Sequence, residues 1–227
     1  MAAMAATGTP AEPVEEKRRD AERTRAEILA VAAAEFADRG YAGARVDEIA
    51  ARTRTTKRMI YYYFTGKEQL YVAVLEDAYA RIRAAEQLVE VDHLDPVAAI
   101  RRIAEVTFDH HEANPAFIRL VSIENIHRGE HIARLPSLVN LNTPAVSLLG
   151  EILTRGGDQG LFRTDVDALD VHMMISAFCF FRVANQHTFG AIFGRDLVDP
   201  GRRAHYRAML SDMVVAHLTS APPAYGT

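Results

Sequence analysis

Five consecutive residues carry side chains suited to contact a nucleic acid: Thr55, Thr56, Lys57, Arg58 and Met59. The Lys57 and Arg58 side chains are donors that match the O6 and N7 acceptors of guanine in the major groove. The hydroxyls of Tyr62 and Tyr63 can donate to phosphate oxygens, and Lys67 adds a charge at a helix start that already favours an anion. The segment therefore predicts contacts to both the bases and the backbone of DNA.

Two short helices must position these side chains. Apolar spacing predicts one over 46–52, and a second follows over 56–62, where Thr56 can cap the first turn. A longer amphipathic helix over 18–39 precedes them, with Gly40 as its stop. Two short helices joined by a tight turn and packed on a third form a helix-turn-helix, whose second helix enters the major groove.

An ordered series of motifs runs from Thr24 to Leu75. The motif residues are Ile28-Leu29, Ala33, Phe36 and Gly40-Tyr41, then 46–50, then Thr56-Lys57 and 60–64, then 67–70. Together they resemble the DNA-binding part of the TetR family of bacterial regulators. The resemblance implies that Tyr63 and Lys67 grip phosphate and that residues 56–59 read bases. It also implies a ligand-responsive transcriptional repressor that binds palindromic operator DNA as a homodimer.

Three positions depart from the family's pattern. Ala44-Arg45 stands where a Thr is usual, and Arg54 and Arg58 stand where Gly is usual. Arg54 must either adopt a left-handed conformation, which favours Gly, or alter the turn. The added arginines, Arg45 among them, are expected to extend the DNA contacts, so the operator should differ from those of near relatives. Tyr61 is expected in the core because it follows an apolar helix position.

Basic residues are concentrated near one end of a chain whose net charge is −4. From Lys17 to Lys67 there are 12 Lys and Arg against 7 Asp and Glu. Such a basic segment on an acidic body suggests that this end meets a polyanion, although a solvated charged face would have the same composition.

The rest of the sequence also shows helical periodicity and no sustained strand pattern, so the expected fold is all-α. Further helices are expected over 67–91, 96–111, 117–126, 137–154 (ended by Gly156-Gly157), 168–188 (capped by Asp165 or Asp167) and 200–218. The expected domains are a disordered tail over 1–16, a three-helix DNA-binding domain over 17–66, an effector-binding and dimerisation domain over 67–219 and a tail over 220–227.

By the same resemblance, the C-terminal helices hold a small-molecule effector of unknown identity. The expected ligand-binding residues are Phe108, His111, Phe117, Glu124, Asn125, Asn140, Phe178, Phe181, Arg182 and Asn185. Their mixture of aromatic and polar groups suits a mostly apolar ligand with a few polar atoms. The resemblance also implies a homodimer formed through the last two long helices. Arg182 needs a buried partner, which is either the ligand or a salt bridge at the dimer interface.

Several classes of protein are disfavoured by the sequence. There is no phosphate-binding Gly loop, metal-ligand set or nucleophile elbow, so no catalytic residue, metal or cofactor is assigned. Charged residues interrupt every apolar stretch, which argues against a membrane span and for a cytoplasmic protein. The single cysteine, Cys179, lies among apolar residues and is expected to be a buried thiol. A transcriptional activator or a less sequence-specific architectural DNA-binding protein stays open as the alternative.

Overall fold

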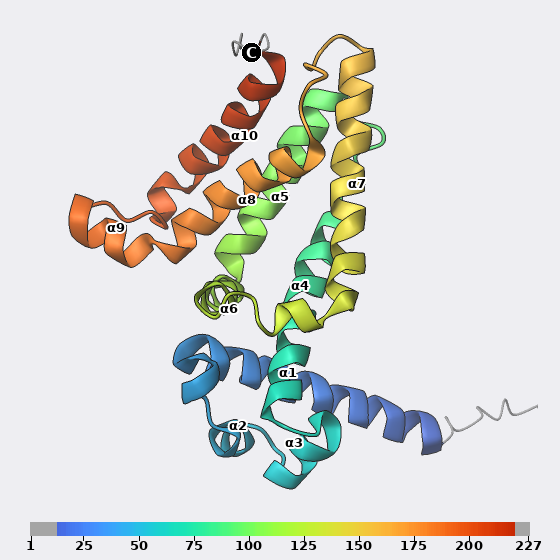
Figure 1. Cartoon of the computed structure of the whole chain (residues 1–227), viewed down its shortest axis with the longest axis vertical. Helices are drawn as coiled ribbons and strands as arrows, with labels where there is room; N and C mark the ends of the chain where they lie inside the picture. The colour runs from blue at the N-terminus through green and yellow to red at the C-terminus, as the bar shows by residue number, and fades with distance from the viewer. Residues whose placement is uncertain (1–12, 221–227) are drawn as a thin grey trace, which may run out of the picture. The chain divides into compact units, whose positions relative to one another are not determined.

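The computed structural model describes residues 13–220, apart from the side chains of 13–14 and 139–142. Within that range the chain is helical and contains no β-strand, which confirms the all-α prediction (Figure 1). It divides into two compact units, of which the first ends at Val74 and the second begins at Leu75. No helix of the described part is long and apolar enough to cross a membrane.

The first unit is built from α1 (Pro13–Gly43), α2 (Val46–Arg52), α3 (Lys57–Phe64) and the start of α4 (Lys67–Gln87). Each helix contributes fully buried apolar side chains to one small core, which are Ile28 and Phe36 of α1, Ile49 of α2, Ile60 of α3 and Leu70 of α4. Because these positions recur at helical spacing, burying them fixes which face of α2 and α3 is left to solvent.

The first helical segment of α1 ends at Gly40, as predicted. This residue leaves the helical conformation (φ 69°, ψ 171°), and a second, short helical segment runs on to Gly43. Gly40 therefore ends the long segment in a conformation that favours glycine, and only a short helical turn follows it within α1.

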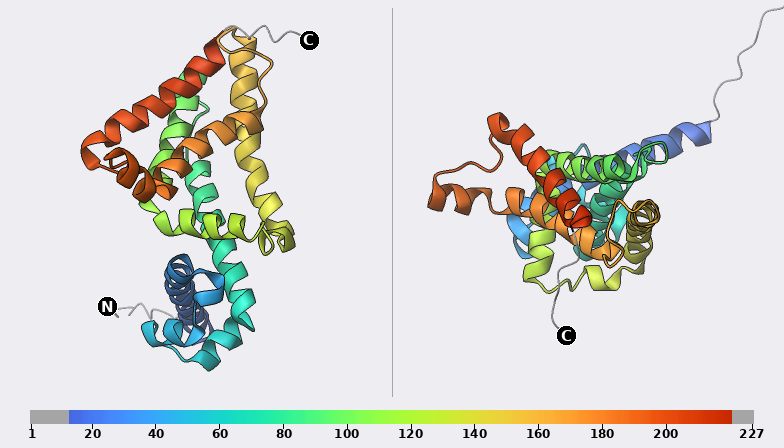
Figure 2. Two further views of the ribbon diagram at one scale, coloured as in Figure 1. Left: turned by 60° about the vertical axis from the view of Figure 1, so that its left-hand side comes forward. Right: turned by 90° about the horizontal axis from the view of Figure 1, so that it is seen from above.

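The second unit contains the rest of α4 and a group of helices around α5. Their bounds are α5 Pro96–Ala113, α6 Pro115–Ile126, α7 Pro136–Asp158, α8 Ala168–Ala184, α9 Gln186–Phe193 and α10 Arg203–Thr219, with 3-10 turns η1 Ile132–Arg134 and η2 Pro200–Arg202. Helix α5 packs against α7, α8 and α10 (Figures 1 and 2). Its Ile100, Ala104 and Phe108 are fully buried. Cys179 of α8 lies in the same core, where burial raises its thiol pKa to about 12 and confirms an uncharged buried thiol.

The Gly156-Gly157 pair does not end α7, so that prediction is wrong. The helix continues to Asp158. A Cβ on Gly156 would lie 2.0 Å from Cδ2 of Phe162, whose ring is buried. The glycine is therefore explained by the close approach of an aromatic ring to the helix.

Helix α8 is shorter than the sequence predicts. Asp167 rather than Asp165 caps it, since its Oδ1 accepts from the Leu169 amide at 2.6 Å. The helix ends at Ala184, and the separate α9 begins after Asn185. Asn185 leaves the helical conformation (φ −101°, ψ 5°). The apolar residues keep their helical spacing from α8 into α9. The sequence therefore predicts one helix where the structure has two.

Candidate functional site

The first turn of α3 presents the side chains that are predicted to read DNA. Thr56 precedes the helix, and its Oγ1 accepts from the Met59 amide at 3.3 Å, which confirms the predicted cap. Lys57, Arg58 and Met59 are exposed, whereas Ile60 behind them is fully buried. The buried face therefore fixes the direction in which the basic turn points.

Lys57 is paired with an acid on the preceding helix. Its Nζ lies 2.9 Å from Oδ1 and 3.1 Å from Oδ2 of Asp47, and this hydrogen bond raises the pKa of Lys57. Both side chains are exposed. Arg58, by contrast, has no ion-pair or hydrogen-bond partner among the described residues. The structure thus has one restrained and one unrestrained cation at the start of α3.

Tyr61 is not a core residue, so the prediction of a buried ring is wrong. Its side chain is 40% exposed, and Lys57 Nζ lies 6.0 Å from its ring centroid. The core position one turn after Ile60 is filled by Phe64 instead, because positions four apart share a helix face. Tyr62 is 79% exposed.

Lys67, the first residue of α4, is held close to the first unit's own backbone. Its Nζ donates to the Ala42 carbonyl at 3.2 Å and lies 5.1 Å from the ring centroid of Tyr41. Partial burial lowers the pKa of Lys67. Thr65, just before it, takes a positive φ of 63°. The half-buried Tyr63 lies one residue before the buried end of α3.

The turn between α2 and α3 is altered, because Arg54 does not adopt a left-handed conformation. Thr53 ends α2 in an extended conformation, and its Oγ1 donates to the Ile49 carbonyl at 3.0 Å. The Arg54 amide donates to Glu27 of α1 at 3.4 Å. Thr55 is half-buried within this turn.

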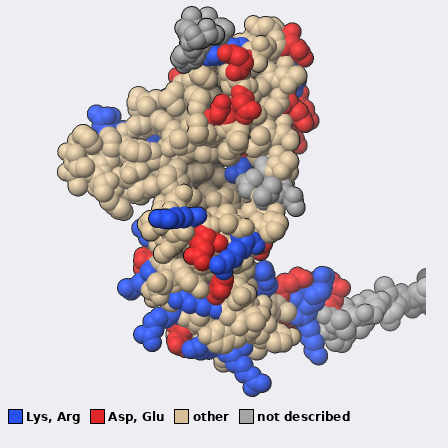
Figure 3. All heavy atoms as spheres, in the orientation of Figure 1, with Lys and Arg blue, Asp and Glu red and all other residues tan. Residues whose placement is uncertain are grey.

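A buried acid on α1 holds both ends of α2. Glu35 is 7% exposed and accepts from the Arg45 amide at 3.3 Å and from Nη1 of Arg52 at 3.4 Å. The Arg45 side chain is exposed just before α2 and makes no capping hydrogen bond. On the face shown in Figure 3, Lys and Arg side chains gather over the helices of the first unit.

The second unit contains a cavity of about 330 Å³ among α4, α5, α6 and α8. It is lined by Tyr79, Ile82, Arg83, His111, Phe117, Val121, Asn125, His172, Met173, Ser176, Ala177 and Phe180. Its walls are mainly aromatic and aliphatic, and a few polar groups reach it, as in sites that bind small molecules.

The cavity brings together three of the predicted ligand-binding residues, namely His111, Phe117 and Asn125. Phe108 lies instead in the core of the second unit. Glu124 is almost fully buried, and its carboxylate accepts from the His131 amide at 3.2 Å and is bonded to His131 Nδ1 at 2.9 Å. This carboxylate ties η1 to α6, and Glu124 is not part of the cavity lining.

The other predicted ligand-binding residues lie elsewhere. Phe178 packs against the core, Phe181 is 48% exposed and Asn185 lies between α8 and α9. The buried Arg182 donates to the Leu197 carbonyl from Nε at 3.0 Å and from Nη2 at 2.9 Å. Arg182 Nη2 also lies 3.2 Å from the Glu112 carboxylate, so the charge has a partner within its own chain. The side chain of Asn140 lies outside the described residues.

Two histidines of the cavity are neutral at pH 7. Burial lowers the pKa of His111 to about 4 and also lowers that of His172. Nδ1 of His111 lies 2.8 Å from the Thr107 carbonyl, which can only accept, so this nitrogen carries the proton and Nε2 is an acceptor.

Arg83 lines the cavity, although the sequence does not predict it as a ligand-binding residue. It is 6% exposed, and its Nη1 lies 2.5 Å from Oε2 of the equally buried Glu86. Burial raises the pKa of Glu86 even though Arg83 opposes that shift. The sequence carries little signal for this arrangement, because an Arg and Glu three residues apart are usually a solvent-exposed helix pair.

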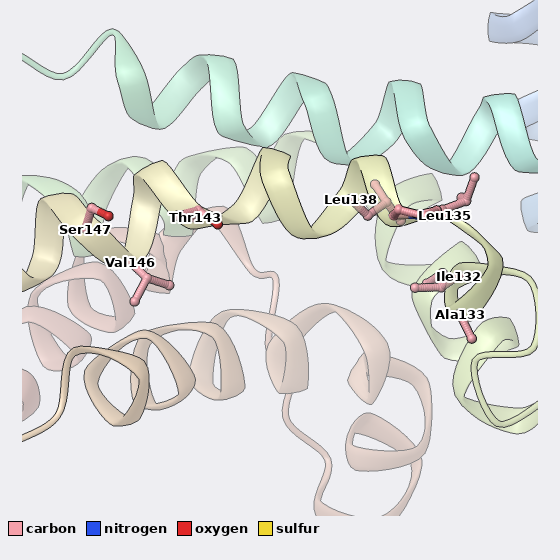
Figure 4. A pocket seen from close by; sticks show the side chains of 8 residues that line it. Ile132, Ala133, Leu135, Leu138, Thr143, Val146 and Ser147 are labelled. Atoms are coloured by element: carbon pink, nitrogen blue, oxygen red, sulfur yellow. The ribbon is translucent and has the colours of Figure 1, made fainter.

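A second hollow, of about 660 Å³, lies along η1 and the start of α7 (Figure 4). Its described lining includes Ile132, Leu135, Leu138, Val146 and Ser147. These side chains are mostly apolar, and the described lining contains no charged group. Among the described residues, no cluster of His, Cys, Asp or Glu is arranged to hold a metal ion.

A capped helix-turn-helix with an exposed basic turn, followed by a helical unit with a cavity, defines a DNA-binding regulator. Residues 28–74 match the family described as "Bacterial regulatory proteins, tetR family", and residues 96–214 match "Tetracyclin repressor-like, C-terminal domain". The chain belongs to the TetR family of bacterial regulators.

Similar proteins of known sequence or structure agree with this assignment. The chain is 34% identical over 202 residues to the HTH-type transcriptional repressor NicS of Pseudomonas putida, covering 89% of this chain and 95% of NicS. It is 40% identical over 118 residues to the repressor SCO4008 of Streptomyces coelicolor, covering 52% of this chain and 57% of SCO4008. The solved structure of SCO4942 from Streptomyces coelicolor superposes with a TM-score of 0.63 at 30% identity, covering 84% of this chain and 97% of that one.

Proposed function

We propose that the protein is a ligand-responsive transcriptional repressor that binds palindromic operator DNA as a homodimer and is released by a small-molecule effector. The observation that carries this proposal is the first turn of α3, where Lys57 and Arg58 are exposed and the buried face of the helix fixes their direction. Repression rather than activation is supported by NicS and SCO4008, both named as repressors. The chain is proposed to have no catalytic role.

Arg45, Thr55, Thr56, Lys57, Arg58, Met59, Tyr62, Tyr63 and Lys67 are the proposed DNA contacts. Their side chains suit two kinds of contact, to base edges and to phosphates. The exposed side chains of residues 57–59 are suited to base edges, whereas Tyr62, Tyr63 and Lys67 are suited to phosphate. The side chain of Thr56 also caps α3 and so helps to position that helix.

A homodimer is supported by the apolar surface of α8 and α10. Leu169 and Met173 of α8 are 58% and 61% exposed, and Met209 and Met213 of α10 are 43% and 41% exposed. Each pair is four residues apart and therefore forms a stripe on one helix face. A two-fold interface would remove these stripes from water. Light scattering is expected to give a dimer for the wild type and a monomer after Met209→Asp with Met213→Asp.

The cavity of the second unit is the proposed effector site. Helix α4 carries Lys67 at its first turn and the cavity residues Tyr79 and Arg83 further along. A ligand that contacts these two residues could change the preferred position of α4. Effector and operator would then weaken each other's binding by the same factor.

The experiment that tests the proposal is selection of DNA from a random library followed by a binding titration. The expected result is enrichment of one palindromic site, with half-sites spaced by about one helical turn or a multiple of it. The selected site should bind more tightly than random DNA by a factor of about 10³ or more at physiological salt. Enrichment of no sequence would contradict the proposal and favour an architectural DNA-binding protein.

A further inference from the structure

The cavity among α4, α5, α6 and α8 contains a buried donor that the protein leaves unpaired. Nε of Arg83 is inaccessible to solvent and has no hydrogen-bond partner within the described residues. The side chain itself is only 7% exposed. Because a buried N–H without an acceptor is costly, such groups in native proteins usually mark the place of a missing partner. The residue lines the cavity, so a ligand could supply that partner once a turn of the guanidinium brings Nε to the cavity surface.

The geometry of the guanidinium indicates which kind of group would fit. Nη1 of Arg83 is paired with the Glu86 carboxylate, so Nε and Nη2 are the nitrogens that could donate to a ligand. These two nitrogens lie along one edge of the guanidinium, and their N–H bonds point the same way. A carboxylate accepts two parallel hydrogen bonds along such an edge.

The charge around the cavity favours an anion. Arg83 is the only residue of the described lining that is charged at neutral pH, because burial keeps His111 and His172 neutral. The positive charge of Arg83 also contributes to the lowered pKa of both histidines, so its field reaches these rings. A negatively charged ligand would be stabilised by the same field.

The walls of the cavity indicate the body of the ligand. Tyr79 and Phe117 meet edge to face with centroids 5.3 Å apart, and His111 meets Phe117 in the same way at 5.7 Å. Phe180 adds a further ring to the lining. Aromatic edges and faces of this kind pack well on a flat apolar group. A volume of about 330 Å³ is near the lower end of small-molecule sites, which suits a body of one ring.

We propose that this cavity binds a small aromatic acid of one ring, with its carboxylate held by Nε and Nη2 of Arg83. The proposal deepens the proposed function and rests on it, because it names the chemical class of the effector. Neutral His111 offers an acceptor at Nε2, so a hydroxyl or N–H on the ring would add affinity. Glu86 positions the guanidinium and is not expected to touch the ligand.

The test uses the full-length protein and four matched probes at millimolar concentration. Benzoate and 4-hydroxybenzoate are the acids, benzamide is the neutral analogue and benzylamine is the cation. Thermal shift and calorimetry are expected to show binding of at least one acid that is about tenfold or more tighter than benzamide, as for a charge-assisted hydrogen bond in a buried site. Benzylamine should not bind.

The decisive variant pairs Arg83→Gln with Glu86→Gln, because the single change would leave a buried carboxylate without its partner. The double variant removes both charges. Its affinity for the acid should then be about equal to its affinity for benzamide. The control pairs Arg81→Gln with Asp77→Asn, which removes an exposed ion pair of 2.8 Å on the same helix. The control should keep the wild-type preference.

Three results would overturn the inference: no acid binds, benzamide or benzylamine binds as tightly as the acids, or the Arg83 and Glu86 double variant keeps the preference. Operator binding is measured in parallel without ligand. Tight operator binding together with any of these results would contradict the ligand class and leave the proposed repressor function standing. Loss of operator binding in the wild type would contradict the proposed function itself.

Discussion

Asp47 Oδ1 lies 2.9 Å from Lys57 Nζ, so an acid of α2 holds the first cation of α3. For Lys57 to contact DNA, this ion pair must open or be shared with the DNA. The carboxylate itself would also repel nearby phosphates. The pair is therefore expected to weaken binding to any DNA on which Lys57 makes no contact that replaces it.

Asp47→Asn is expected to strengthen binding to random DNA by about twofold to fivefold, the scale of an exposed ion pair. The control is Glu48→Gln, which removes the same charge from the next residue. Glu48 has no ion-pair partner within the described part of the chain. Titrations at low salt should show a smaller gain for the control. An equal gain for both variants would mean that net charge, not the release of Lys57, is responsible.

Lys67→Ala is expected to weaken operator and random DNA alike, because a phosphate contact is independent of sequence. A dimer carries two copies of Lys67. The slope of log affinity against log salt should therefore flatten by about 2, since each phosphate contact contributes roughly 0.9. An unchanged slope would show that Lys67 stays on the Ala42 carbonyl in the complex.

Gly156→Ala is expected to destabilise the second unit. The new methyl would lie 2.0 Å from Phe162, and overpacking of this kind costs about 1 to 3 kcal/mol. Gly150→Ala on the same helix is the control, because its Cβ would meet only Ala168 Cβ at 3.9 Å. There the loss of a helical glycine should stabilise by about 0.5 to 1 kcal/mol. Urea unfolding measures both, and equal midpoints would contradict the packing of Phe162 on α7.

His111 is expected to make stability fall in acid. Burial depresses its pKa in the folded state to about 4, below the ordinary value of 6.5. Its contribution is therefore fully present above pH 6.5 and is lost as pH falls from there through about 4. Between pH 7 and pH 5 the wild type should lose about 2 kcal/mol more than His111→Phe. His187→Phe is the control, because it removes an exposed imidazole and should not reproduce the effect of His111→Phe.

Much of the fold follows from the 3.6-residue period of apolar side chains, because helices that bury one face must show that period. The failures occur where contacts between distant residues decide. Gly156 is explained by Phe162, and Tyr61 is displaced from the core by Phe64. Local sequence cannot reveal which of several apolar helix positions packs inward.

The candidate sites were predictable to different degrees. Residues 55–59 lie within one continuous segment, so their position could be inferred from the motif that contains them. The cavity is made by four helices, and its position depends on how these helices pack. The sequence predicts His111 and Phe117 as lining residues. It does not predict Tyr79, Arg83 and His172, because the packing of the helices decides which side chains face the cavity.

The most direct test of the account is the sequence preference of Arg58→Ala on the selected operator and its single-base variants. Arg58 is exposed and without an ion-pair partner among the described side chains, so it is proposed to read a guanine. The variant should lose about 1 to 3 kcal/mol per contact on operator, lose little on random DNA and tolerate any base at one position of each half-site. The exposed Arg102 of α5 is the control, and Arg102→Ala should bind as the wild type does. Equal losses on operator and random DNA, with the base preference intact, would contradict base reading by the first turn of α3.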